Sequence, residues 1–199
     1  YQDAQTLFAA QVLSDVLCGS NHAPLCRAIL EQGLAEDVVL SCDEQCMQPN
    51  LLLRVQNFRE ADLPAIEATI RNTLTALCEN GLDRAQIEAS LASFEFKLRE
   101  RDYGTMPRGL VFELEILSSW LYGGDPAVRL RFGEVFDTLH AAVGTGYYEN
   151  LLRRLMLENP HTAEVLLQPS LTCGQARQDR ERESLGKTCK TLDEAQRSR

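Results

Sequence analysis

Three histidines are the first residues to consider, because imidazole is the commonest protein ligand of a catalytic zinc ion. A hydrolytic zinc site needs two histidines at i and i+4 of one helix, with a glutamate beside them. His22, His140 and His161 instead lie far apart, in three different expected elements. We expect His140 to be a packed or surface residue, and His22 to cap a short helix beginning near Pro24. No metal ligand is therefore assigned.

Cysteines offer the second possible metal chemistry. The count of seven is odd and fairly high. No CxxC pair and no zinc-finger spacing occurs, and Cys42 and Cys46, four residues apart, come closest to a metal pair. We expect mostly buried, reduced thiols, which implies a reducing compartment such as the cytoplasm or an organelle matrix. The full set is Cys18, Cys26, Cys42, Cys46, Cys78, Cys173 and Cys189.

Other catalytic patterns are missing from the sequence. It has no GxSxG nucleophile elbow and no phosphate-binding glycine loop, and Gly144-Thr145-Gly146 suits a connector between helices. Glu113 is the one oddity, since it falls within an apolar helical stripe. We expect it to have a structural role near a helix N-terminus, where the dipole favours a carboxylate. No catalytic, cofactor-binding or metal-binding residue is assigned.

Charge and hydropathy narrow the class of protein further. The 199 residues carry a net charge of −9, which argues against a nucleic-acid surface. No apolar run reaches the roughly 18 residues of a membrane span. The sequence opens on Tyr1-Gln2-Asp3, without a methionine or a signal sequence. We expect it to be a piece of a longer protein.

The stretch from Leu110 to Pro126 has the strongest helical pattern. Its leucines recur at i, i+4, i+7 and i+11, and aromatic and β-branched residues widen the stripe to more than half the circumference. This predicts a core helix packed against more than one neighbour. It should stop at Gly123-Gly124, and Asp125 and Pro126 should begin the next helix.

The remaining elements indicate an α+β fold. Two strands, Val38–Ser41 and Leu51–Phe58, should form an antiparallel pair, and Ala163–Leu167 should add a third strand, because two strands alone are marginal in water. Helices should cover one face of this antiparallel-rich sheet. Apolar residues at helical spacing predict further helices over residues 6–17, 25–32, 62–78, 83–101, 125–143 and 147–157.

The composition changes after Pro169. From Ser170 to Arg199 leucines are isolated, and charges of both signs are interleaved. This pattern suits a solvated helix or a disordered tail. We therefore predict a domain over residues 1–169 and a charged linker over residues 170–199.

Three segments together resemble a known family. HAPLCRAILEQGL (His22 to Leu34) resembles the segment after the first helix of pitrilysin-type, or insulinase-like, zinc peptidases. GLDRAQIEASLASFEFKLRE (Gly81 to Glu100) and SSWLYGGDP (Ser118 to Pro126) resemble their presequence-protease subgroup. Order and spacing agree, over roughly Asp3 to Pro169.

The resemblance implies a place within a larger enzyme. Members have four related α+β domains, in two halves that enclose a peptide in a closed chamber. The first domain holds the zinc in an H-x-x-E-H motif with a distal glutamate, and a helical hairpin joins the halves. This sequence resembles the second domain, which has the same fold without metal. Its first strand, before Tyr1, would be missing, and the hairpin would begin after Ser170.

No H-x-x-E-H occurs here, so no zinc ligand and no catalytic glutamate is carried over. The resemblance implies a part of a zinc metalloendopeptidase for unstructured peptides, with this domain as chamber wall and zinc only in the parent's first domain. Its partners would be the remaining domains of the same chain and, through them, the peptide. Two alternatives stay open. One is a stand-alone, non-catalytic binding or assembly subunit, and the other is a helical adaptor domain.

Overall fold

The computed structural model describes residues 3–44, 46–100 and 104–191, of which Thr191 is described in its backbone only. The chain divides into two compact units, Tyr1–Pro160 and His161–Arg199. The elements of the first unit are α1 (Ala4–Cys18), α2 (Pro24–Leu30), β1 (Asp37–Asp43), β2 (Asn50–Gln56), η1 (Glu60–Asp62), α3 (Leu63–Asn80), α4 (Arg84–Glu100), α5 (Arg108–Trp120), α6 (Gly133–Ala141), α7 (Tyr147–Leu152) and the π-helical η2 (Arg153–Leu157). The second unit contains α8 (Cys173–Thr191).

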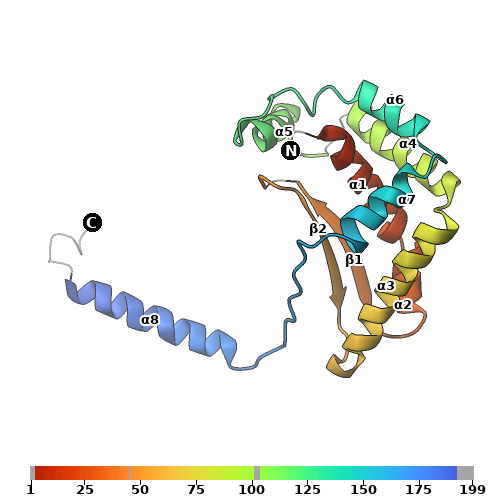
Figure 1. The fold of residues 1–199 in the computed structure, drawn as a ribbon. Helices are drawn as coiled ribbons and strands as arrows, with labels where there is room; N and C mark the ends of the chain where they lie inside the picture. Colours follow the sequence, from red (N-terminus) through yellow and green to blue (C-terminus); the bar gives the residue numbers. More distant parts are fainter. Residues whose placement is uncertain (1–2, 45, 101–103, 192–199) are drawn as a thin grey trace. The chain divides into compact units, whose positions relative to one another are not determined.

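The core of the first unit is built around α1, not around α5. Asp3 caps the N-terminus of α1, and its carboxylate accepts a hydrogen bond from the Thr6 amide at 2.9 Å. Apolar residues on most sides of α1 are buried, and it contacts β1 and helices α2, α4, α6 and α7 (Figure 1). Phe8 of α1 meets the fully buried Phe136 of α6, with ring centroids 5.2 Å apart. The prediction that the Trp120 helix is the core element is wrong.

The sheet is an antiparallel pair, as predicted, with Leu40 opposite Leu53. Val38 and Leu40 are buried on the face that the helices cover, while Leu52 is exposed on the other face. The prediction of a third strand is wrong. The segment Ala163–Leu167 has no regular secondary structure and lies in the second unit, and Val165 and Leu167 are largely exposed. An apolar β-branched run becomes a strand only where a partner takes up its backbone hydrogen bonds. The described chain is thus a mostly helical α+β protein with a small sheet.

Two features of the helix boundaries differ from expectation. The sequence Gly19-Ser20-Asn21 predicts a left-handed glycine at the end of α1, but the φ of Gly19 is −69°. A glycine is needed there for space, because a Cβ would lie 2.5 Å from the Asp15 carbonyl oxygen. The helix expected from Asp125 begins only at Gly133, since Asp125 first supports a turn by accepting the Ala127 amide at 2.9 Å.

The described residues of the second unit form one exposed helix, α8, after a segment without regular secondary structure. Every residue from His161 to Lys190 is exposed. A solvated helix was one of the two predictions for this region, and it is confirmed over Cys173–Thr191, while residues 192–199 lie outside the described residues. Within the described parts of both units, no helix is long and apolar enough to cross a membrane.

Candidate functional site

The three histidines are not brought together into a metal site. His140 Nε2 lies 3.3 Å from Glu95 Oε2 at the surface, so it is paired with a single carboxylate. His22 is exposed, and no side chain of the described residues caps α2. His161 belongs to the second unit. Across residues 3–44, 46–100 and 104–191, no group of three or more histidine, cysteine, aspartate or glutamate side chains could hold a metal ion.

The cysteines are free thiols with no metal-binding arrangement in the part of the chain described. Cys26 Sγ donates to the Val38 carbonyl at 3.3 Å. Burial raises the pKa of Cys18, and it raises the pKa of Cys42 to about 11. These thiols therefore stay protonated near neutral pH and are poor nucleophiles and ligands. Cys26 and Cys78 are buried, Cys18, Cys42 and Cys46 are half-buried, and Cys173 and Cys189 are exposed. The prediction of mostly buried cysteines is therefore wrong.

The most connected polar cluster is centred on Arg129, just before α6. Its side chain is only 3% exposed. Nη1 lies 3.0 Å from Glu44 Oε2 and 3.7 Å from Glu115 Oε2, and Nη2 donates to the Glu44 carbonyl at 3.1 Å. Gln11 of α1 donates to the same Glu44 oxygen at 2.7 Å. The cluster thus ties together α1, the end of β1, α5 and the turn before α6.

The electrostatics of this cluster indicate a structural role. Burial raises the pKa of Glu44, the Arg129 guanidinium opposes that rise, and the Glu115 carboxylate adds to it. A guanidinium presents N–H donors and no acceptor, so Arg129 offers neither a base nor a nucleophile. Sequence analysis missed all four residues of this cluster. Arg129 stands in the run AVRLRF, where nothing distinguishes it from Arg131.

Glu113 takes a different position from the one expected. No acidic residue lies in the first turn of α5, so the helix dipole does not explain it. Its side chain is exposed, whereas Glu115, two residues on, points inward to Arg129. Among the described residues Glu113 has no ion pair. The carboxylate with a structural partner is therefore Glu115.

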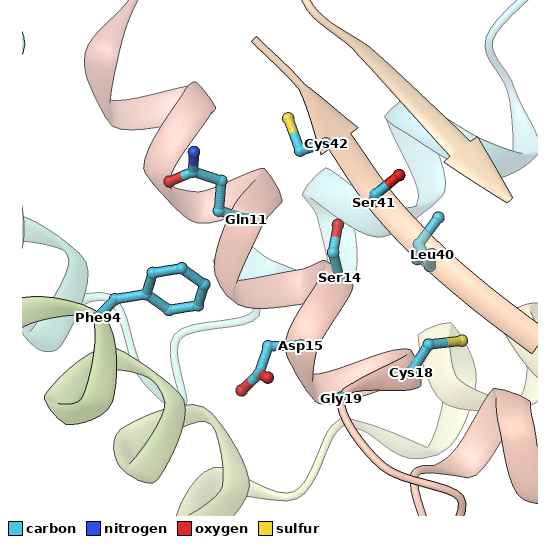
Figure 2. Close-up of a pocket in the computed structure, with 9 residues that line it drawn as sticks. All are labelled: Gln11, Ser14, Asp15, Cys18, Gly19, Leu40, Ser41, Cys42 and Phe94. Atoms are coloured by element: carbon cyan, nitrogen blue, oxygen red, sulfur yellow. The ribbon is translucent and has the colours of Figure 1, made fainter. Parts of the chain in front are cut away.

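Two open hollows, with volumes of about 290 and 300 Å³, lie along the polar side of α1. In Figure 2, Gln11, Ser14 and Asp15 line the first hollow from successive turns of α1, opposite Phe94. Asp15 and Gly19 line both hollows, and His22 lines the second. The Ser14 hydroxyl is already used, because it donates to the Ala10 carbonyl at 2.9 Å. Ser20 and Ser90 also line the second hollow, but no hydrogen bond among the described residues joins either serine to His22 or Asp15.

The comparisons with known proteins give the family. Residues 1–94 match the family described as the peptidase M16 inactive domain. The protein named HypA of Clostridium perfringens is 35% identical over 167 residues, and presequence protease 1, chloroplastic/mitochondrial, of Arabidopsis thaliana is 32% identical over 172 residues. Each alignment covers 84% of this chain. This chain belongs to the M16 peptidase family, as an inactive domain. The predicted resemblance is confirmed. The homologues of this chain are presequence proteases, and they align with most of its length.

A solved structure supports the fold of this M16 inactive domain. The inactive peptidase domain of a proposed zinc protease from Bordetella parapertussis matches with a TM-score of 0.55. The match covers 75% of each chain at 15% sequence identity, so it bears on the fold alone.

The M16 inactive domain corresponds to a small part of its curated relatives. The alignments span 17% of the Clostridium protein and 16% of the Arabidopsis protein. The residues described here do not fit a zinc ion, and the family description likewise concerns a domain without activity. What the relatives do as whole proteins therefore has to be proposed separately for this chain.

Proposed function

We propose that this chain is the non-catalytic second domain of a zinc metalloendopeptidase that degrades unstructured peptides. The observation that carries the proposal is the inactive-domain match over residues 1–94, combined with 32% identity to a presequence protease over 84% of the chain. The domain would form chamber wall and inter-domain packing, and zinc would be held elsewhere in the parent. The Arg129 cluster supports this role, because its ion pairs and hydrogen bonds join α1, the end of β1, α5 and the turn before α6.

The second unit would be the beginning of the linker between the two halves of the parent. Helix α8 carries the ion pairs Glu183–Lys187, at 2.7 Å, and Asp179–Arg182, at 3.7 Å. Such pairs support a solvated helix. The names of several relatives place them in mitochondria, so a reducing compartment, organelle matrix or cytoplasm, is the location we propose.

A fluorogenic peptide assay tests the proposal. The purified 199-residue chain with added zinc should hydrolyse no peptide, whereas the longer protein should hydrolyse unstructured peptides in a chelator-sensitive way. Chelator-sensitive cleavage by the 199-residue chain would refute the non-catalytic assignment. A gene that encodes only this chain would instead support a stand-alone binding or assembly subunit.

A further inference from the structure

Helix α5 shows its apolar face to solvent. Leu110 is 42% exposed, Leu114 47%, Trp120 62% and Leu121 69%. Residues 110, 114 and 121 follow at i, i+4 and i+11, so they share one side of the helix. A contiguous apolar surface of this kind on a folded unit marks an interaction site more often than a single exposed leucine does.

The inward side of α5 carries small residues, two of which are serines. Val111, Ser118 and Ser119 are buried. The Ser118 hydroxyl donates to the Glu115 carbonyl at 2.6 Å, and the Ser119 hydroxyl donates to the Asp125 carbonyl at 2.9 Å.

The ion pair between Glu115 and Arg129 fixes this orientation. Turning the helix to bury its leucines would move Glu115 away from a guanidinium that is only 3% exposed. Losing one of its two carboxylates would be unfavourable for a charge so deeply buried. The outward apolar face is therefore held in place by polar contacts.

Glu113 lies within that outward face. Leu117 and Trp120 follow it at i+4 and i+7, on the same side of the helix. Its exposed carboxylate has no ion pair among the described residues. Covering a carboxylate with apolar groups alone is unfavourable, so whatever covers this face must bring a cation to Glu113.

We propose that this surface packs against an apolar surface of the remainder of the same polypeptide, which places a lysine or arginine opposite Glu113. The inference rests on the proposed function, in which this chain is one domain of a longer protein. The aligned region is 16–17% of the relatives' length, so most of their polypeptide is available to supply the partner surface. We call this surface the α5 face; it consists of Leu110, Glu113, Leu114, Leu117, Trp120 and Leu121.

Hydroxyl-radical footprinting tests the proposal, because Trp120 is the only tryptophan in the chain. The labelling of side chains is compared between the 199-residue chain and the longer protein. Trp120 labelling should fall several-fold in the longer protein, toward that of the fully buried Phe136. Phe96, which is 64% exposed against 62% for Trp120, is the matched control and should change little. Equal labelling of Trp120 in both proteins would overturn the proposal.

Variants of the longer protein identify the contact. L114D and E113K should each restore Trp120 labelling, whereas L52D should not, although Leu52 and Leu114 are both 47% exposed. Two further outcomes would overturn the proposal. In one, the 199-residue chain alone protects Trp120 as its concentration rises, which means that a second copy covers the face. In the other, protection appears only after an unstructured peptide is added. Trp120 labelling does not depend on peptide hydrolysis, so the two proposals fail separately. A longer protein without peptidase activity would refute the proposed function, whereas the packing of the α5 face would still be decided by the labelling of Trp120.

Discussion

At the scale of single residues, two arginines that share the same local sequence have opposite environments. Arg129 is 3% exposed and contacts two carboxylates, whereas the Arg131 side chain is 73% exposed and pairs with Asp125 at 3.3 Å. The difference comes from Glu44 and Gln11, which are distant in the sequence. No local pattern contains that information, so this cluster could not be predicted.

Replacing Arg129 by methionine should destabilise the first unit by about 3 kcal/mol, because it leaves two partly buried carboxylates without their cation. The matched change Arg131→Met removes an exposed pair and should cost less than about 1 kcal/mol. Urea denaturation followed by circular dichroism measures both free energies of unfolding. Equal losses for the two variants would contradict the structural role of Arg129.

Glu44 should give the chain a definite pH dependence. Burial raises its pKa above the ordinary value of 4.5, so between pH 4.5 and the raised pKa the folded chain holds a proton that the unfolded chain releases. The Glu44 contribution to the free energy of unfolding therefore decreases as pH rises from 4.5 through the raised pKa.

The variant Glu44→Gln isolates the Glu44 contribution to the pH dependence of stability. Glu95 has the opposite effect, because the hydrogen bond from Arg99 lowers its pKa, so the useful quantity is the difference between wild type and variant. Urea denaturation at a series of pH values measures that difference. The free energy of unfolding of the wild type minus that of the variant should decrease as pH rises. A difference that is constant with pH would show that Glu44 titrates normally.

At the scale of elements, helical periodicity predicted the positions of the helices, because it depends on local side-chain spacing. It could not predict the direction of the α5 face, since Leu110–Trp120 has apolar residues on most sides and Arg129 decides which side turns inward. The prediction of a strand over Ala163–Leu167 is wrong for a related reason. A strand needs a partner edge, and sequence spacing says nothing about that edge.

The end of α1 provides a test at this scale. Gly19→Ala would place a Cβ 2.5 Å from the Asp15 carbonyl oxygen, which cannot move without disturbing the helix. We expect a loss of about 1–3 kcal/mol. Gly109→Ala, in α5, meets nothing within 4 Å and should change stability by less than about 1 kcal/mol. Thermal melting of both variants, compared at equal concentration, distinguishes a close-packed Gly19 from an ordinary helix end.

At the scale of the whole molecule, the family could be predicted from three segments in the right order. No catalytic residue was assigned, because no histidine, cysteine or serine has the spacing of a known catalytic motif. The first unit forms one core around α1, and all the buried residues of the described chain lie between Ala4 and Leu152. The second unit contributes none of them. The domain boundary near Pro169 stays a prediction. The division into two compact units falls in the sequence between Pro160 and His161.

Truncation after Pro160 tests whether the first unit folds without the second. Because none of the described residues 161–190 that the truncation removes is buried, the free energy of unfolding of the shorter chain should stay within about 0.5 kcal/mol of that of the full chain. The helical signal of α8 should be lost, and in the full chain that signal should melt gradually, since a helix of 19 residues without a packed face is marginal in water. Urea denaturation of residues 1–160 and 1–199, followed by circular dichroism, measures both. Loss of the cooperative transition in the shorter chain would mean that residues 161–199 stabilise the core, and the linker role proposed for α8 would then have to be abandoned.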